Sequence, residues 1–397
     1  MTGVSTLGQA LRQIENIKNQ QTAFNTLSSQ LTTGKKSLSF TGLGTDTLAS
    51  TRARTSLSSL SVYASNIDRA DLRINLMLNS VEEFQSQTGN ISSALVNFLQ
   101  EGVHQKGATI TYDDPSTPEV EETPVGMTSA ESDNDLQSLI DIAGNLYDFM
   151  ISLLNTKDGD RYIFGGAETL TKPLNDGGTL DAAMSSLITN WKSGSITTDE
   201  LIADLTDRTA TNGNADAITD TLIGYSSSLS SGTAGKVFVR ADKSAELDYT
   251  TLANDQSFRD IIVALSFLKN ENLPPIADVY EDGVYPGTPD AQGAPGADIE
   301  EMKENFYAVF NKVVSMVDSA IDNIDSTRFN LESVRAQMKQ IADDQTNQKT
   351  LLLNVVSDIE DVDVNEVAVK INALQVQIQT SYSVTALASQ LSLVNFL

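Results

Sequence analysis

The chain has 397 residues, of which 53 are acidic and 26 basic, so its formal charge is -27; it contains no cysteine and one histidine. Nucleic acid phosphates and an anionic membrane surface would both repel such a chain, so neither is an expected partner. Without cysteine the chain has no disulfides, thiolate metal sites or thiol nucleophiles. Carboxylates are the groups left for catalysis.

The N-terminal segment predicts a helix and not a targeting signal. Met1–Gln13 has neither the basic nor the apolar part of an ordinary secretory signal, and no run reaches the roughly 18 apolar residues of a membrane-spanning helix. Apolar residues recur every three or four positions up to the Gly34-Lys35-Lys36 turn, which is typical of an amphipathic helix. They are Val4, Leu7, Leu11, Ile14, Ile17, Phe24, Leu27 and Leu31.

The middle of the chain holds two long helical stretches and several interruptions. The absence of glycine and proline over 45–88 predicts a helix from 45 to 100, and a second, strongly apolar helix is expected over 136–154. Two segments rich in Pro, Gly and Asp, 101–126 and 273–298, are expected to be surface insertions. Short helical and strand-like runs broken by glycines indicate a small α+β domain at 166–248.

The final 101 residues contain neither glycine nor proline and predict two further helices. Over 299–360 an apolar stripe from Phe306 to Ile359 is expected to pack inside the subunit, in a helix of about 90 Å at 1.5 Å per residue. Over 362–397 a third stripe continues with one five-residue step. It consists of Val367, Ile371, Leu374, Ile378, Tyr382, Leu387, Leu391 and Val394.

The charge is unevenly placed. Residues 1–100 carry 8 basic and 6 acidic side chains, residues 101–310 carry 12 and 36, and residues 311–397 carry 6 and 11. Two terminal helices paired alone would leave apolar faces exposed, so we expect their stripes to form an assembly interface between subunits. The predicted fold class is mainly α: a long antiparallel, coiled-coil-like rod formed by the N- and C-terminal regions, with a small inserted α+β domain.

Motifs of enzymes and metal sites are absent or incomplete. Gly42-x-Gly44 lacks the third glycine of a dinucleotide site, and Gly235-Lys236 lacks the rest of a phosphate loop. The pairs Asp113-Asp114, Asp133-x-Asp135 and Asp158-x-Asp160 lack the spacing of a complete calcium loop and are interpreted as solvated loop acids. His104 is expected to be a surface residue, and Trp191 a core anchor of the inserted domain. We expect no catalytic residues, bound metal or cofactor.

Two segments resemble a known family. Gly159-Asp-Arg-Tyr-Ile-Phe-Gly-Gly166 is similar to a Gly-x-x-Tyr-x-Phe-x-Gly segment of the flagellin superfamily of axial flagellar proteins. The end of the chain, with Leu374-Gln375, Ser381-Tyr382 and Leu391-Ser-Leu-Val-Asn-Phe-Leu397, resembles the closing segments of that superfamily. Both segments look most like the hook-filament junction members, the hook-associated proteins of type 3. The resemblance covers about the first 100 residues, 136–170 and the last 100.

The resemblance implies a layered, self-assembling subunit. It implies an inner layer from 1–35 with 362–397, a helical rod from 36–165 with 249–361, and an outer domain at 166–248. The implied function is an adaptor that joins the flagellar hook, through the first hook-associated protein, to the flagellin filament. The implied location is extracellular, reached through the flagellar secretion channel without a cleaved signal peptide and with the help of an export chaperone.

Other functions stay open at this point. The chain could be a flagellin, the filament subunit itself, or a flagellin-like protein of the cell surface. A non-flagellar adhesin or coiled-coil tether would show the same periodicity. A carboxylate-dependent hydrolase in the inserted domain has no motif in its favour.

Overall fold

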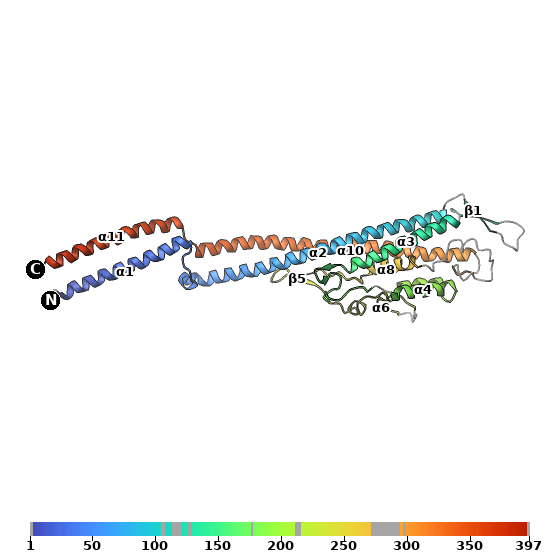
Figure 1. The fold of residues 1–397 in the computed structure, drawn as a ribbon, viewed down its shortest axis with the longest axis horizontal. Coiled ribbons are helices and arrows are strands. Elements are labelled where there is room, and N and C mark those ends of the chain that lie inside the picture. Colours follow the sequence, from blue (N-terminus) through green and yellow to red (C-terminus); the bar gives the residue numbers. More distant parts are fainter. Residues whose placement is uncertain are drawn as a thin grey trace. The chain divides into compact units, whose positions relative to one another are not determined.

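The computed structural model describes residues 3–104, 108–112, 121–125, 129–175, 178–210, 216–270, 294–296 and 299–394, and these are mainly helical (Figure 1). The chain divides into two compact units: a terminal unit of Met1–Ser65 with Ile341–Leu397, and a central unit of Asn66–Gln340. The long helices are α1 (Gly3–Thr33), α2 (Thr47–His104), α3 (Ser129–Leu154), α10 (Ile299–Glu360) and α11 (Val364–Val394). The predicted fold class is confirmed.

In the terminal unit, α1 packs antiparallel to α11, and the two helices lie side by side in blue and red in Figure 1. Each is separated from the next long helix by a short break. After α1 the chain passes through residues 34–39 and the 3-10 helix η1 (Phe40–Asp46), and α10 and α11 are separated by residues 361–363. An isolated antiparallel bridge between Lys35 and Asp361 joins the two breaks.

The core of the central unit surrounds a short apolar helix, α8 (Gln256–Leu268), whose residues from Ser257 to Leu268 are all buried. The Phe258 ring meets Phe84 of α2 edge to face at 4.9 Å, and Phe267 meets Phe310 of α10 at 6.2 Å between centroids. Most residues of α8 are apolar, and burial of such a helix among the longer helices explains its central place.

An ion pair and a hydrogen bond between α2 and α10 fix the antiparallel register of these helices in the central unit. Arg335 pairs with Asp71 at 2.8 Å, and Gln85 donates to Asp325 at 2.9 Å. The predicted stripe of α10 is buried in this unit, at Phe306, Phe310, Val313, Val317, Ile324, Leu331 and Met338. Beyond Met338, in the terminal unit, the same stripe is less covered: Val355 is 37% exposed. The expectation of packing inside the subunit is therefore met fully only up to Met338.

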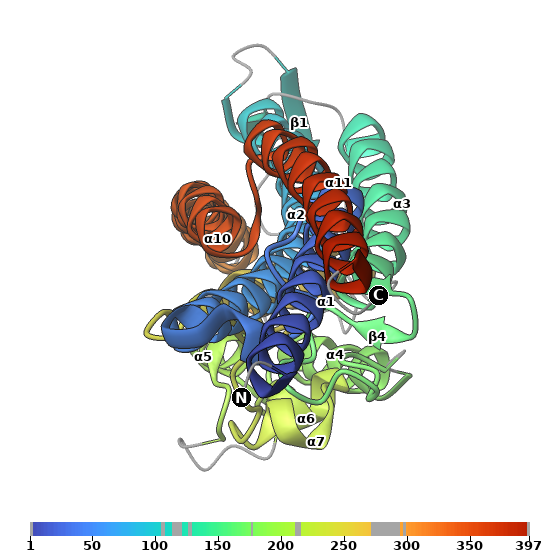
Figure 2. The same ribbon diagram turned by 90° about the vertical axis from the view of Figure 1, so that its left-hand side faces the viewer.

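Short elements make up the remainder. The helices are α4 (Gly178–Lys192), α5 (Thr198–Thr206), α6 (Asp220–Ile223) and α7 (Ser227–Ser230), which gather in one region of the central unit (Figure 2). The strands form three antiparallel pairs: β1 (Ala108–Tyr112) with β2 (Glu121–Val125), β3 (Lys157–Asp158) with β4 (Arg161–Tyr162), and β5 (Phe238–Arg240) with β6 (Glu246–Asp248). Within the insertion at 101–126, the described strands form a hairpin; 273–293 and 297–298 of the second insertion lie outside the described residues.

The segment that resembles the flagellin superfamily attaches the small elements to the core. Buried Arg73 of α2 donates to the carbonyl oxygen of Tyr162 at 3.1 Å. Phe164 is 1% exposed and packs on Phe258 at 5.8 Å, and its carbonyl accepts a bond from Ala253. Gly166 has φ of +62°, and a Cβ there would lie 2.7 Å from the Gly235 carbonyl oxygen, so only glycine fits.

Candidate assembly surface

The pairing of α1 with α11 buries part of both predicted terminal stripes. Val367 and Ile371 are 5% and 8% exposed. Farther along the pair, Gln21 donates to the Tyr382 hydroxyl at 2.6 Å and Ser381 donates to Gln20 at 3.1 Å. The amide and hydroxyl groups between the apolar positions therefore hold the two helices in register.

The other predicted interface residues differ in exposure. Ile17, Phe24, Leu27, Leu374 and Ile378 are half-buried. Leu11, Ile14, Leu31, Tyr382 and Leu387 are exposed, by 58%, 60%, 39%, 48% and 59%. The side chains of Val4, Leu7, Leu391 and Val394 lie outside the described residues. The structure thus brings the middle of the stripes together within the subunit and leaves Leu11, Ile14 and Leu387 for other contacts.

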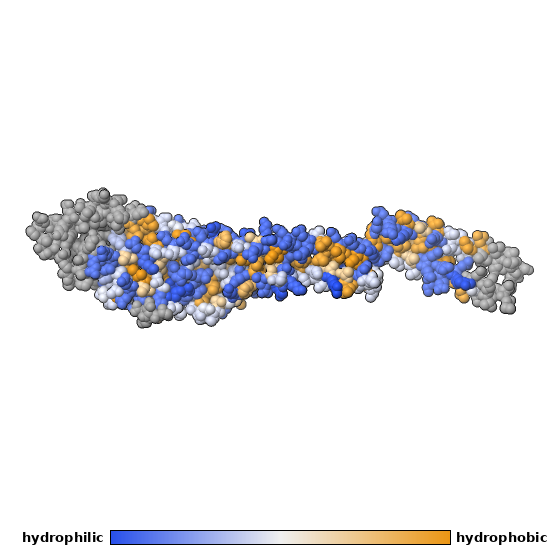
Figure 3. Space-filling model, turned by 180° about the vertical axis from the view of Figure 1, so that it is seen from behind, coloured by the Kyte–Doolittle hydropathy of each residue, from blue (hydrophilic) through white to orange (hydrophobic). Residues whose placement is uncertain are grey.

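A second apolar face of α11 is not predicted by the sequence pattern. Val369, Val376 and Val384 are 68%, 62% and 50% exposed. At about 100° per residue Val369 and Val376 lie on the side of the helix opposite Val367, while Val384 lies about 100° from Val367. The five-residue step from Tyr382 moves the predicted stripe onto the side opposite Val367 at Leu387. One feature of the sequence indicates this face: residues 371–397 contain no charged side chain, so the predicted apolar stripe has no charged face opposite it. Figure 3 shows hydrophobic residues at the surface of the terminal helices, toward the right of the view.

Apolar side chains are also exposed near the helix breaks. Leu38 is 78% exposed in the segment after α1, and Phe40 and Leu48 follow at 49% and 58%. On the last turns of α10, Leu351 and Leu353 are 65% and 49% exposed. A soluble monomer seldom exposes so many large apolar groups on one unit, and such surfaces mark interaction sites.

A charged cluster holds the two breaks together, and we call it the joint. Glu360, at the end of α10, is 5% exposed. Its carboxylate accepts bonds from Arg54 Nε at 2.7 Å and Ser50 Oγ at 2.6 Å, and Lys35 Nζ lies 3.5 Å away. Lys35 also donates to Asp361. Backbone bonds from Lys36 to the Glu360 carbonyl and from Val362 to the Gly34 carbonyl add a short ladder.

The joint stabilises its own ionised state. The hydrogen bonds from Arg54 outweigh burial and hold the pKa of Glu360 at about 2, below its ordinary 4.5. The bond between Lys35 and Asp361 raises the pKa of the lysine and lowers that of the aspartate. Because hydrogen bonds to the charged form favour that form, all four groups are charged at neutral pH. The joint is therefore an ion-paired crossing point between the N- and C-terminal segments.

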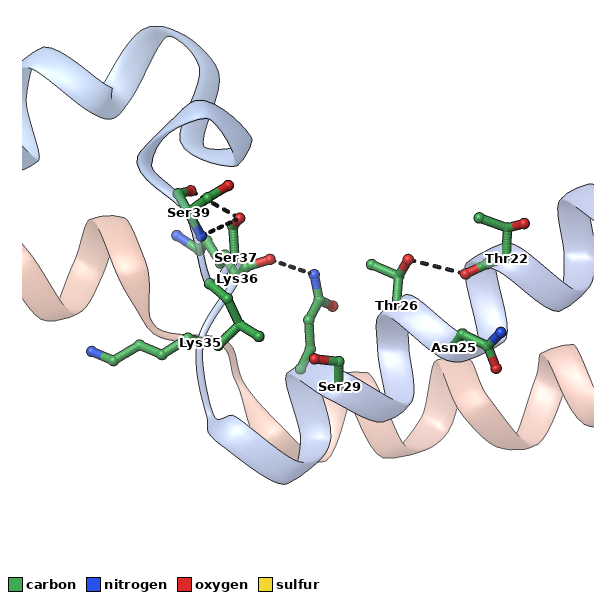
Figure 4. A pocket seen from close by; sticks show the side chains of 10 residues that line it. Thr22, Asn25, Thr26, Ser29, Lys35, Lys36, Ser37 and Ser39 are labelled. Atoms are coloured by element: carbon green, nitrogen blue, oxygen red, sulfur yellow. Dashed lines mark hydrogen bonds between the residues drawn. The ribbon is translucent and has the colours of Figure 1, made fainter.

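A groove of about 490 Å³ lies beside the joint (Figure 4). It is lined by Thr22, Asn25, Thr26, Ser29, Gln30, Lys35, Lys36, Ser37, Leu38 and Ser39. Gln30 donates to the Lys36 carbonyl at 2.8 Å. Figure 4 shows Thr22 and Thr26 on the side of α1 turned away from α11. The groove therefore lies on the free face of the terminal pair.

The described residues include no cluster with the ligand set of a metal site. No group of three or more His, Asp or Glu side chains gathers there, and no helix in the described ranges is long and apolar enough to cross a membrane. Asp113, Asp114 and the side chains of His104, Asp133 and Asp135 lie outside the described residues. Asp158 and Asp160 lie in the β3–β4 hairpin.

The inserted region uses its polar groups for structure. Trp191 is 1% exposed and donates through Nε1 to the Thr198 hydroxyl at 3.0 Å, which confirms it as a core anchor. The buried Asp220 carboxylate accepts a bond from Arg208 Nε at 3.1 Å and lies 3.4 Å from Arg259 Nε. The two guanidinium groups balance the charge of this buried carboxylate, as in a structural ion pair.

Comparison with known proteins identifies the C-terminal segment. Residues 314–397 match the family described as the bacterial flagellin C-terminal helical region. No curated protein matches the chain. Among solved structures, a candidate flagellar hook-associated protein from Vibrio parahaemolyticus is similar over 79% of this chain and 97% of that chain, with 12% identity and a TM-score of 0.39. A likeness at that TM-score does not bear on function. The segment that is similar to the bacterial flagellin C-terminal helical region, residues 314–397, includes most of α10 and all of α11.

Proposed function

We propose that the protein is a structural subunit of the bacterial flagellum that assembles through its terminal helices. The observation that carries the proposal is the flagellin C-terminal helical region at 314–397, whose last helix is paired with α1 and exposes apolar side chains. Burial of these faces between neighbouring subunits would supply the free energy of assembly, at about 25 cal/mol per Å² of apolar surface. The location is then the extracellular flagellum.

Within the flagellum we propose the role of adaptor at the hook-filament junction. The resemblance of Gly159–Gly166 and of the last 24 residues, 374–397, to junction proteins supports it. The partners would be further copies of this chain, the first hook-associated protein on the hook side and flagellin on the filament side, with an export chaperone before secretion. The layers would be 1–35 with 362–397 innermost, 36–165 with 249–361 outside them, and 166–248 outermost.

The alternative is a flagellin, and the match of 314–397 to a flagellin family favours it. Electron microscopy of a gene-deletion strain separates the two roles. Loss of a junction protein leaves hooks without filaments and releases flagellin into the medium, whereas loss of a sole flagellin leaves bare hooks and no filament protein to release. Normal filaments in a strain without related genes would contradict both.

The interface assignment has a separate test. We expect Leu387→Asp to leave the monomer folded, because Leu387 is 59% exposed, but to prevent incorporation into flagella, since a buried unpaired charge is strongly unfavourable. Phe238→Asp is the control: Phe238 is 53% exposed but lies in the central unit, and this variant should incorporate normally. Equal incorporation of both variants would contradict the assignment.

A further inference from the structure

The terminal pair has two free faces, one on each helix and on opposite sides. On α11, Val369, Val376 and Leu387 lie about 180° to 200° around the helix from Val367, which is 5% exposed. On α1, Thr22, Thr26 and Ser29 lie about 140° to 200° around the helix from Phe24. The α1 face contains the groove, and the α11 face is an exposed apolar ridge.

The part of the groove that α1 contributes has mostly small polar side chains, and both lysines of the groove have partners. The Thr22 hydroxyl donates to the Lys18 carbonyl and the Thr26 hydroxyl to the Thr22 carbonyl, both at 3.0 Å. With its hydroxyl bonded back to the helix, each threonine has its methyl group left for packing. Lys36 Nζ donates to the Asp358 carbonyl at 2.6 Å, and Lys35 is engaged by Asp361. Small side chains on one helix allow a second helix to approach closely.

The free face of α11 has the complementary chemistry. From residue 371 to 397 this face has Asn, Gln, Thr, Ser and Ala beside its apolar side chains and no charged residue. Lys370, next to Val369, is paired with Glu366 at 2.6 Å. Such a helix could enter the groove without removing a charge from water, a step that costs several kcal/mol per ion. A charged partner helix would have no counter-ion there, because Lys35 and Lys36 already have partners.

We propose that the free face of α11 in one copy packs into the α1 groove of a second copy. The proposal rests on the assembly proposed above and names the two surfaces that meet. The two surfaces are different and lie on opposite sides of the pair, so the contact is heterologous. A heterologous contact leaves one free surface of each kind at the ends of any oligomer, and therefore builds rings or filaments and not closed dimers.

The absence of cysteine allows a direct test on the full-length protein. Thr26→Cys is combined in turn with Val369→Cys, Val376→Cys and Leu387→Cys, and each single variant serves as the matched control. The two positions of each pair lie on opposite sides of the terminal helices and cannot bond within one chain. The purified variants are concentrated, assembly is followed by light scattering, and the samples are oxidised and separated on a denaturing gel.

We expect at least one double variant to give a ladder of dimers, trimers and larger species that collapses on reduction, while its single variants give at most a dimer. Assembly without a ladder from any double variant would overturn the pairing but not the proposed self-assembly. Dimers from single variants as strong as those from the double variants would favour like-to-like packing and also overturn it. Failure of the cysteine-free parent to assemble at any concentration would overturn the self-assembly and the pairing together.

Discussion

Replacing Glu360 by glutamine tests the joint. The substitution keeps the size of the side chain and one acceptor oxygen but removes the charge that Arg54 and Lys35 surround. Since Glu360 is 5% exposed, the amide stays buried against a guanidinium that has lost its counter-ion. We expect Glu360→Gln to loosen the crossing of α1–α2 with α10–α11 while the central unit, which contains none of these groups, stays unchanged.

The size of the effect follows from the pKa. A pKa of about 2 in place of 4.5 corresponds to about 3 kcal/mol at 1.36 kcal/mol per unit. The side chains of Arg54 and Lys35 are 48% and 38% exposed, and water screens their attraction, so we expect about 2 kcal/mol to be lost. That lies within the range of about 1.5 to 3 kcal/mol for hydrogen bonds to charged groups.

Hydrogen exchange resolved by segment is the suitable assay, because the two units need not unfold together. About 2 kcal/mol corresponds to roughly thirtyfold faster exchange of amides in α1 and in residues 341–394. Glu332→Gln is the control: Glu332 is 49% exposed and lies 3.6 Å from Arg328, and an exposed pair of this kind contributes at most about 0.5 kcal/mol. Unchanged exchange at residues 341–394 in Glu360→Gln would show that the joint contributes nothing to stability.

Three further predictions concern pH and two buried positions. Because the folded pKa of Glu360 is depressed, its stabilisation is complete above about pH 4.5 and falls as the pH drops towards 2, which thermal unfolding by circular dichroism would reveal as a decreasing Tm. Gly166→Ala should destabilise the central unit by about 2 kcal/mol or more, since its Cβ would lie 2.7 Å from a carbonyl oxygen, whereas Gly194→Ala, in open space at φ +70°, should cost about 1 kcal/mol in denaturant titrations. Trp191→Phe should cost about 2 kcal/mol in the same titrations, since it leaves the Thr198 hydroxyl without its indole donor and opens a void.

The sequence predicts the long helices because the residues that begin and end each helix lie next to its ends in the sequence. Helix breakers are absent from the last 101 residues, and α10 ends at Glu360, where the apolar stripe ends. The start of α11 is also local: the Asp363 carboxylate accepts bonds from the amides of Asn365 and Glu366, an N-terminal cap that needs no glycine or proline. Residues 129–135, which α3 adds before its predicted start, contain six polar or acidic residues that obscure the apolar period.

The joint could not be predicted from the sequence because the residues that pair in it are far apart along the chain. Arg54 and Glu360 are separated by 306 positions, and nothing local marks either residue as half of a pair. The two faces of α11 were missed for another reason. The predicted stripe joined Val367–Tyr382 and Leu387–Val394 across a five-residue step, which at about 100° per residue turns the helix by more than one full turn and changes the face. Only packing against α1 shows which apolar residues are left over.

Exposed apolar surface and charge are segregated between the two units, and this is the physical basis of the proposed assembly. Among the described residues, 16 exposed large apolar side chains lie in the terminal unit and 6 in the central unit. The terminal unit has 8 basic and 9 acidic side chains, and the central unit has 18 and 44. Net charge keeps a protein soluble but also opposes close approach of identical copies. A nearly neutral terminal unit can therefore pack against its neighbours while the acidic central unit keeps the free subunit in solution.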